Sequence, residues 1–260
     1  MGKVISIFSG KGGVGKTTLA LNLSITLIDL GFNVLTIEGN YNAPSLESFT
    51  NIFIKSKKLD KYLRENEPIE NLIVKTNVKL SLLFSSPIIR DLTREDMEKM
   101  EEAFKKLKDM YDFIVIDSGP GLGGDLKFFS KFTDISVVVT TATLPSILNT
   151  LRVLSYLEID HPKGTYTEYV VLNKYKKKKY YLPVEECEEL LERKIDLVLP
   201  YEEVVIESLR YHVPVVWYKK NSKFSRGVFN LAYWISGKKH PELEKKPNPI
   251  MEIINKILNR

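Results

Sequence analysis

The chain has 260 residues, of which 43% are hydrophobic, enough to build one large α/β domain with an ordinary buried core. Its net charge of +5 comes from 38 basic and 33 acidic residues, an excess too small to indicate nucleic-acid binding by itself. The single cysteine, Cys187, excludes an internal disulfide and a cysteine-rich metal or iron–sulfur site.

The apolar runs and the first residues of the chain indicate where in the cell the protein is located. No run approaches the roughly 18 apolar residues of a transmembrane helix. Met1-Gly2-Lys3 leads directly into the first predicted strand in place of a signal peptide. We therefore expect a cytoplasmic protein that is at most peripheral on the inner face of the cell membrane.

Short β-branched runs alternate with helical patterns, which predicts an α/β fold: a doubly wound, mostly parallel sheet with helices on both faces. The predicted strands cover residues 4–8, 34–37, 80–84, 113–116, 135–140, 169–172 and 195–199. The predicted helices cover residues 16–30, 93–109, 145–158, 184–192, 202–211 and 223–236. The second of them starts with a capping box formed by Thr93 and Asp96. Residues 43–78 are the least legible stretch and suit small helices over one edge of the sheet.

A glycine-rich loop joins the first predicted strand to the first predicted helix. Residues 10–17 fit G-x-x-x-x-G-K-[ST], the pattern of a phosphate-binding loop, and the flanking strand and helix supply its structural context. Backbone N–H groups and the helix N-terminus would bind a polyphosphate, Lys16 would reach its β- and γ-phosphates, and Thr17 would bind Mg²⁺. The predicted nucleotide-binding residues of the loop are Gly10, Lys11, Gly12, Gly13, Val14, Gly15, Lys16, Thr17 and Thr18.

A second lysine inside this loop, Lys11, gives the sequence Lys-Gly-Gly-Val-Gly-Lys-Thr-Thr. With it the chain resembles the deviant Walker A P-loop ATPases of the MinD/ParA family, and among these it looks most like the MinD-like members. The resemblance implies ATP and ADP as ligands, together with Mg²⁺. It also implies an ATP-hydrolysing homodimer in which Lys11 crosses the interface to the phosphates of the partner copy, with Lys11 and Lys16 as catalytic residues.

The second predicted strand ends in Glu38-Gly39-Asn40, where most members of that family carry Asp-x-Asp. A glutamate can still reach a hydrated Mg²⁺, so Glu38 is a predicted metal contact. Asn40, the third predicted catalytic residue, can orient the attacking water but cannot accept its proton. We therefore expect hydrolysis that is slow or waits for an activating protein partner; the alternative is that the catalytic role is shared so widely that the change matters little.

Four apolar residues precede Asp117 at the carboxyl end of a predicted buried strand. Open α/β sheets bind ligands at this edge, so Asp117 is placed to hold Mg²⁺ through water. The glycine-rich residues 118–124 suit a switch that responds to the γ-phosphate, with Gly121 among the nucleotide contacts. Residues 92–95 and 112–118 are similar to the matching stretches of MinD, and the resemblance covers residues 3 to about 236.

Asn173 follows the predicted strand 169–172, where the family places an asparagine that reads adenine; a turn asparagine is the alternative. A lysine- and tyrosine-rich run, residues 174–181, comes next. Such a run suits a solvated loop, or contacts to DNA or to anionic lipid.

The last residues divide the chain into an ATPase domain at 1–237, a basic proline-containing linker at 238–249 and an amphipathic helix at 250–260. This helix suits an anionic membrane surface, a groove on a protein partner, or its own domain. Its apolar face consists of Ile250, Met251, Ile253, Ile254, Ile257 and Leu258.

Together these features predict a MinD-like ATPase that forms an ATP-sandwich dimer. Its nucleotide state would control its location or its partners, most simply through membrane association of residues 250–260. Two alternatives remain. One is a ParA-like ATPase whose dimer binds DNA without sequence preference, and the other is an ATP-dependent protein-binding scaffold that hydrolyses slowly or not at all.

Overall fold

The computed structural model describes residues 2–86, 93–161 and 166–238. Within these ranges the strands are β1 (Lys3–Phe8), β2 (Val34–Gly39), β3 (Val74–Lys75), β4 (Ser81–Leu83), β5 (Phe113–Ser118), β6 (Ile135–Thr140), β7 (Thr167–Tyr175) and β8 (Leu197–Pro200). They form one sheet in the order β3-β4-β2-β5-β1-β6-β7-β8. Every neighbouring pair is parallel except β3 and β4, which run antiparallel at one edge.

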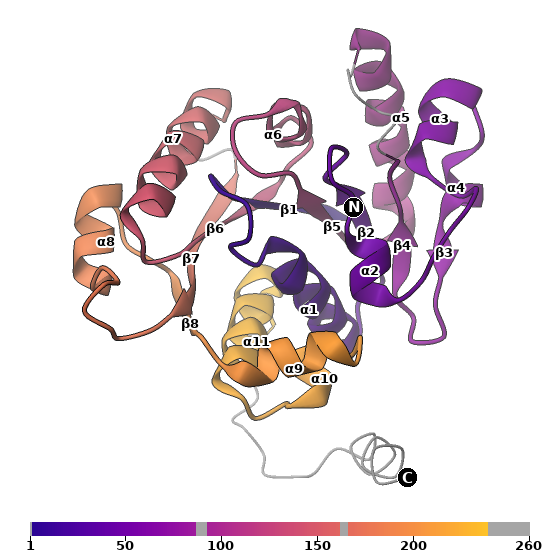
Figure 1. Ribbon diagram of the computed structural model, residues 1–260. Helices are drawn as coiled ribbons and strands as arrows, with labels where there is room; N and C mark the ends of the chain where they lie inside the picture. Colours follow the sequence, from indigo (N-terminus) through magenta and orange to yellow (C-terminus); the bar gives the residue numbers. More distant parts are fainter. Residues whose placement is uncertain (1, 87–92, 162–165, 239–260) are drawn as a thin grey trace, which may run out of the picture.

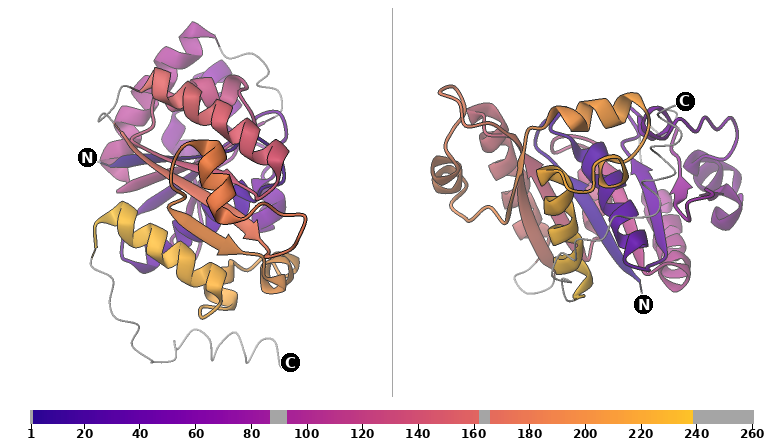
Figure 2. Two further views of the ribbon diagram at one scale, coloured as in Figure 1. Left: turned by 90° about the vertical axis from the view of Figure 1, so that its left-hand side faces the viewer. Right: turned by 90° about the horizontal axis from the view of Figure 1, so that it is seen from below.

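Helices cover both faces of this sheet. They are α1 (Lys16–Asp29), α2 (Leu46–Thr50), α3 (Leu59–Glu65), α4 (Ile69–Leu72), α5 (Arg94–Met110), α6 (Gly124–Ser130), α7 (Leu144–Asp160), α8 (Val184–Leu191), α9 (Glu203–Arg210), α10 (Val215–Tyr218) and α11 (Lys223–Ser236). In Figure 1, α1, α10 and α11 lie on one face and α5, α6, α7 and α8 on the other. Figure 2 shows α9, α10 and α11 in front of the sheet when it is seen from below.

Alternate residues of the central strand β1 face the two helical layers. Val4 and Phe8 belong to the buried cluster that includes α5 to α8, whereas Ile5 and Ile7 belong to the cluster that includes α1 and α11. A strand that is buried on both faces needs apolar side chains at successive positions, which explains the β-branched runs in the sequence. The predicted doubly wound, mostly parallel α/β fold is confirmed.

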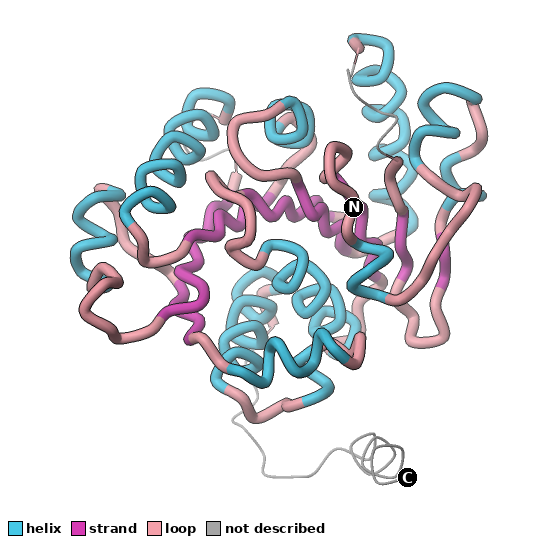
Figure 3. The backbone as a smooth tube through the Cα atoms, in the orientation of Figure 1, coloured by secondary structure: helices cyan, strands magenta, loops and turns pink. Residues whose placement is uncertain are grey.

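The structure departs from the predicted elements at four places, and one of them is the short edge strand β3, which was not predicted. Two helices, α6 and α10, stand where none was predicted, and both are among the helical segments drawn in Figure 3. They have seven and four residues, too few for a helical period to stand out in the sequence. β7 runs on to Tyr175 and pairs there with β8. Asn173 therefore lies inside β7 and not in a turn after the strand.

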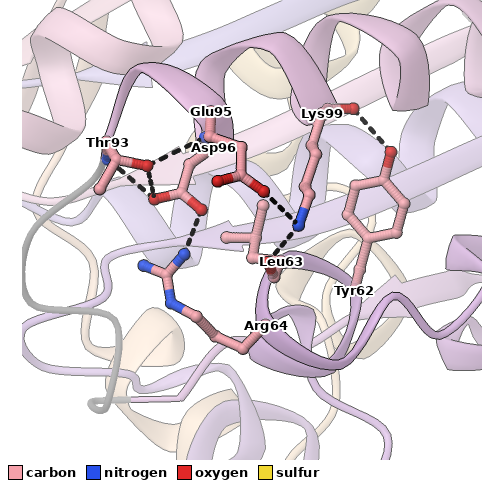
Figure 4. Close-up of polar contacts among 7 residues, drawn as sticks. All are labelled: Tyr62, Leu63, Arg64, Thr93, Glu95, Asp96 and Lys99. Atoms are coloured by element: carbon pink, nitrogen blue, oxygen red, sulfur yellow. Dashed lines mark hydrogen bonds and ion pairs between the residues drawn. The ribbon is translucent and has the colours of Figure 1, made fainter.

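The stretch at residues 43–78 contains α2, α3, α4 and β3, so the predicted small helices near one edge of the sheet are present. Polar contacts join α3 to α5 (Figure 4). The Tyr62 hydroxyl donates a hydrogen bond to the Lys99 carbonyl at 2.6 Å, and Arg64 forms an ion pair with Asp96. These contacts fix α3 against the longer helix.

The predicted capping box at the start of α5 is confirmed. The Asp96 backbone N–H donates to Thr93 Oγ1 at 3.2 Å, and the Thr93 backbone N–H donates to Asp96 Oδ2 at 2.8 Å. Burial alone would raise the pKa of Asp96, but hydrogen bonds from Arg64 and Thr93 outweigh burial, so the pKa is lowered. Asp96 is therefore a buried carboxylate that its neighbours keep ionised.

The described chain ends just beyond α11, which Gly237 caps in a left-handed conformation with φ of 68°. Apart from Lys238, the predicted linker at 238–249 and the predicted helix at 250–260 lie outside the described residues and stay predictions. None of the described helices combines the length and the apolar character that crossing a bilayer requires.

Candidate functional site

The glycine-rich loop between β1 and α1 is shaped by close packing and by left-handed backbone. A Cβ built on Gly10 would lie 2.3 Å from the carbonyl carbon of Asn149 in α7, so only glycine fits there. Gly13 and Gly15 have φ of 76° and 103°, which glycine adopts without strain. Gly15 is the N-cap of α1, whose first turn carries no acidic side chain. The N–H groups at the start of α1 are therefore suited to an anion.

The Lys16 side chain packs back against the loop. Its Nζ donates a hydrogen bond to Ser9 Oγ at 3.0 Å, and the residue is 7% exposed. Burial lowers the pKa of Lys16 and outweighs the opposing effect of the Asp117 and Asp125 carboxylates. An ammonium group that is short of solvent and lies beside a helix N-terminus is a strong site for a phosphate.

Asp117 lies at the end of β5 and contacts the loop through Thr17. The Thr17 hydroxyl donates to Asp117 Oδ2 at 2.5 Å. Asp117 Oδ1 is buried and has no hydrogen-bond partner in the parts of the chain that are described. Burial raises the pKa of Asp117 to about 6, although Thr17 and Lys16 both act to lower it. The structure thus brings Lys16, Thr17 and Asp117 together, as the sequence predicted.

The donor set around Asp117 fits a hydrated Mg²⁺. A carboxylate oxygen without a partner stands beside a threonine hydroxyl, and both are oxygen ligands of the kind Mg²⁺ prefers. Across residues 2–86, 93–161 and 166–238, no three His, Cys, Asp or Glu side chains gather into a metal-binding group. Mg²⁺ usually takes one or two protein ligands and completes its shell with waters and substrate phosphates, so a threonine hydroxyl and one carboxylate would suffice to hold it.

Glu38, the other predicted metal contact, is fully buried and anchors the backbone. Its Oε1 accepts hydrogen bonds from the N–H groups of Ser45 and Leu46 at 2.5 and 2.7 Å, and its Oε2 accepts one from Ser85 at 3.2 Å. Burial raises the pKa of Glu38, and these three N–H groups oppose that shift. Glu38 therefore holds the start of α2 and the end of β4 beside β2, a role that the sequence did not reveal. Its contact with Mg²⁺ stays a prediction.

Asn40 follows β2 and turns one end of its amide toward the loop after β5. Its Nδ2 donates to the Ala43 carbonyl at 2.7 Å. Its Oδ1 is buried without a hydrogen-bond partner among the described residues, and it lies 3.2 Å from the position of a Cβ built on Gly119. The amide thus keeps a free acceptor next to the glycine-rich switch.

The predicted switch, residues 118–124, is tied to β1 and to the phosphate loop. The Ser118 hydroxyl donates to the Ile7 carbonyl at 2.7 Å, and the Gly121 N–H donates to the Ser9 carbonyl at the same distance. Gly121 has φ of 82°, which favours glycine. A change in the phosphate loop could therefore reach this segment through the bond between Gly121 and Ser9, because Ser9 directly precedes the loop.

Asn173 touches the phosphate loop from behind. Its Nδ2 donates to the Val14 carbonyl at 2.8 Å, and its Oδ1 accepts the Lys174 N–H at 2.9 Å. A Cβ on Gly15 would lie 2.4 Å from the same Nδ2, so the amide packs directly on this glycine. One amide hydrogen and one lone pair remain for another partner. Recognition of adenine by Asn173 stays a prediction.

Two predicted loop residues lie apart from this cluster. Lys11 is exposed. Thr18 is buried and lines an apolar cavity of about 230 Å³ that Leu21 of α1 and Phe49 of α2 also line.

Sequence reasoning missed Ser9 and Asp125. Ser9 precedes the motif and joins Lys16 to the loop by donating to the Lys11 carbonyl at 2.8 Å. Asp125 is 7% exposed in the first turn of α6, and burial raises its pKa to about 6 although Lys16 lowers it in part. An aspartate that begins a helix after Gly-Gly is the signal that would have pointed to Asp125.

Comparison with known proteins agrees with this geometry. A family model described as an AAA domain matches residues 2–144, more than half of the chain. A septum site-determining protein MinD from Thermotoga maritima is 30% identical over 249 residues, which cover 93% of this chain and 90% of that protein. An uncharacterized ATP-binding protein of Methanocaldococcus jannaschii is 29% identical over 234 residues, which cover 90% of this chain and 88% of that protein.

A solved structure of similar fold extends the comparison to the whole domain. The septum site-determining protein MinD from Pyrococcus horikoshii, complexed with Mg-ADP, aligns with a TM-score of 0.77 at 27% identity, covering 90% of this chain and 96% of that chain. The chain belongs to the MinD/ParA family of P-loop ATPases.

Proposed function

We propose that this protein binds ATP with Mg²⁺ at the β1–α1 loop and hydrolyses it to ADP and phosphate. One observation carries the proposal: the second oxygen of Asp117 is buried without a hydrogen-bond partner in the described part of the chain, beside Thr17 and within electrostatic range of Lys16. A hydrated cation would satisfy that oxygen, and the adjoining helix N-terminus would bind the phosphates.

Each residue of the site has one task in this proposal. The N–H groups of residues 10–18 and the Lys16 ammonium hold the β- and γ-phosphates. The Thr17 hydroxyl binds Mg²⁺ directly and Asp117 holds it through water; when bound, the ion neutralises charge on the phosphates. Asn173 uses its remaining amide hydrogen and lone pair on the adenine edge.

The surface around the loop suits a second copy of the chain. Lys11, in the loop itself, is exposed. Leu144 and Leu148, one turn apart on α7, are 49% and 44% exposed, and the same helix contacts Gly10 through Asn149. A cluster of exposed apolar side chains beside a binding site indicates a docking surface. In the ATP-bound homodimer, Lys11 of each copy reaches the phosphates of the other.

Residues 250–260 are the proposed membrane contact. One amphipathic segment of this length binds an anionic surface weakly, with Lys256 and Arg260 near the headgroups. Two segments carried by one dimer bind far more strongly because the second binds at a high effective concentration. The nucleotide state would then move the protein between the cytoplasm and the inner face of the cell membrane.

The DNA-binding alternative depends on the lysine-rich run at 174–181, and the protein uses part of that run internally. Lys174 Nζ donates to a loop carbonyl at 2.7 Å, and Lys176 Nζ lies 3.3 Å from the ring centroid of Tyr201. Residues 177–179 remain exposed. Three lysines provide few phosphate contacts, so we favour the membrane over DNA.

Three assays on one preparation test this proposal: ATP turnover, light scattering with ATP or ADP, and sedimentation with anionic liposomes. We expect slow turnover, a dimer with ATP only, and pelleting that needs both ATP and the residues after Pro247. Lys16→Ala should lose nucleotide binding, whereas Lys11→Ala should keep binding and lose the dimer.

Other outcomes would redirect the proposal. A chain that binds no ATP contradicts it. A chain that binds ATP and dimerises without turnover favours the scaffold, and retention on DNA at low salt without pelleting favours the ParA-like alternative. If turnover rises only when a protein partner is added, that partner is the expected activator. We expect one because Asn40 stands where most members of the family carry an aspartate.

A further inference from the structure

Asp125 is a buried carboxylate that the proposed function does not use. It stands in the first turn of α6, the helix that follows the glycine-rich switch. Its charge lies within electrostatic range of Lys16, and each residue affects the pKa of the other. Because Lys16 is the phosphate-binding lysine of the proposed site, Asp125 lies near the end of the site where the terminal phosphate would bind.

Gly119 brings Asp125 close to Asn40. A Cβ built on Gly119 would lie 2.1 Å from Asp125 Oδ2 and 3.2 Å from Asn40 Oδ1, so both oxygens lie against the same glycine. The φ of Gly119 is outside the left-handed region, so the backbone conformation does not require glycine here. The close approach of the Asp125 carboxylate does require it.

Asn40 contributes an acceptor that nothing in the described residues satisfies. Its Nδ2 is used by the Ala43 carbonyl, and its buried Oδ1 has no partner there. An amide oxygen and a carboxylate oxygen therefore converge on Gly119. Two acceptors that lie against one glycine are suited to a molecule with two hydrogens to donate, and water is such a molecule.

We propose that Asp125 supplies the carboxylate that Asn40 lacks, so that Asp125 Oδ2 and Asn40 Oδ1 together orient the attacking water and Asp125 accepts its proton. This inference rests on the proposed ATP hydrolysis. The water oxygen bonds to the γ-phosphorus, and one water proton moves to Asp125 Oδ2. The bond from the γ-phosphorus to the bridging oxygen breaks, and ADP leaves with its electron pair. Asp125 then returns the proton to the phosphate product.

The surroundings of Asp125 suit a proton acceptor. Burial raises the pKa of Asp125 to about 6, which is closer to neutral pH than the pKa of a free aspartate and improves proton transfer at that pH. The ionisable groups that face it are Lys16 and the buried hydroxyl of Tyr41, and the pKa of Tyr41 is raised by burial first and then by Asp125. Lys16 acts against the effect of burial and lowers the pKa of Asp125 in part.

Asp125→Asn tests the inference because it keeps the shape of the side chain and removes its charge. We expect single-turnover hydrolysis to fall by about 100-fold or more. We also expect affinity for a non-hydrolysable ATP analogue to rise relative to affinity for ADP, because a negative charge near the γ-phosphate is gone. Asp109→Asn, which removes an exposed charge from α5, is the matched control and should change neither quantity.

Gly119→Ala moves the carboxylate without changing its chemistry. The new methyl group would lie 2.1 Å from the present position of Asp125 Oδ2, too close for both to stay in place, so hydrolysis should fall by a similar factor. The double variant with Gly119→Ala and Asp125→Asn should hydrolyse ATP only slightly more slowly than either single variant, since both changes remove the same function. Adding Asn40→Asp to Asp125→Asn again places a carboxylate against Gly119. This should raise the rate of ATP hydrolysis by about tenfold relative to Asp125→Asn alone.

The outcomes separate this inference from the proposed function. Native rates in Asp125→Asn, or fully additive losses in the double variant, overturn the role of Asp125 and leave the ATPase intact. A native chain that binds ATP without hydrolysing it contradicts the ATPase instead. The affinity comparison applies even then: an unchanged ratio of analogue to ADP affinity in Asp125→Asn contradicts its position near the γ-phosphate.

Discussion

Glu38 and Asp117 are carboxylates at facing positions of two neighbouring strands, yet their surroundings differ. They are register partners at the ends of β2 and β5, and they are 0% and 1% exposed. Three backbone N–H groups bind Glu38, whereas Asp117 accepts one hydroxyl hydrogen bond and keeps one oxygen without a partner in the described chain. The local supply of hydrogen-bond donors, and not the position at a strand end, separates Glu38, which anchors the backbone, from Asp117, the proposed metal ligand.

The largest effect is expected on the ligand side of this comparison. Asp117→Asn should reduce single-turnover ATP hydrolysis by about 100-fold or more, since Mg²⁺ would lose its protein carboxylate. The same change should leave the free energy of unfolding without nucleotide unchanged or higher, because it removes a buried charge. Quench-flow kinetics and urea unfolding measure the two quantities. A large loss of stability would show that Asp117 is an anchor like Glu38.

For Glu38, which anchors the backbone, we expect the opposite: its substitution should lower the stability of the fold. Glu38→Gln places an amide among three N–H donors and should lower the free energy of unfolding by about 2–3 kcal/mol, since a charged acceptor is lost and a donor faces donors. Urea unfolding at neutral pH measures this change. If Glu38→Gln unfolds like the native chain and its ATP binding no longer depends on Mg²⁺, Glu38 is a metal contact, as the sequence predicted, and not an anchor.

The pH dependence of stability sharpens the contrast. Burial raises the pKa of Asp117 from 3.8 to about 6, so the folded chain holds this proton more tightly than the unfolded chain does. The resulting stabilisation is present below about pH 4 and is lost as the pH rises through about 6. As the pH rises from about 4 to about 6, the free energy of unfolding of Asp117→Asn should therefore increase by about 2 kcal/mol relative to that of the native chain. Parallel stability curves for the two proteins would contradict this account.

The smallest effect concerns a third buried carboxylate, Asp96, which has a charged partner. Arg64→Ala should lower the free energy of unfolding by about 1 kcal/mol, because Thr93 still donates to the Asp96 carboxylate. Arg94→Ala, which breaks a pair whose side chains are 93% and 65% exposed, should change it by less than about 0.5 kcal/mol. Equal effects for the two arginines would show that burial of the partner does not matter here.

The sequence predicted the parts of the site that depend on local pattern. The loop from Gly10 to Thr18 has the spacing of a phosphate-binding loop and lies between a strand and a helix. Asp117 follows an apolar run, which beside such a loop favours a buried strand that ends at the site. Both lie at the edge that a parallel sheet reserves for ligands, so the contact between Thr17 and Asp117 followed from topology.

The rest depends on contacts between distant segments, which no local pattern shows. The role of Glu38 requires the N–H groups of Ser45, Leu46 and Ser85, and the last of these lies 47 positions away. Asp125 was missed because α6 has seven residues and no readable period. Asn173 was expected after β7 and lies within it, because pairing with β8 extends the strand.

Calorimetric titration of ATP with and without Mg²⁺, into the native chain and into Asp117→Asn, would show whether Asp117 holds the metal ion of the proposed site. We expect Mg²⁺ to tighten ATP binding to the native chain by about tenfold or more and to have little effect on the variant, because we propose that the hydrated ion binds at the unpartnered Asp117 oxygen. Equal Mg²⁺ dependence in the two proteins would contradict the assignment of Asp117 as the metal ligand of this site.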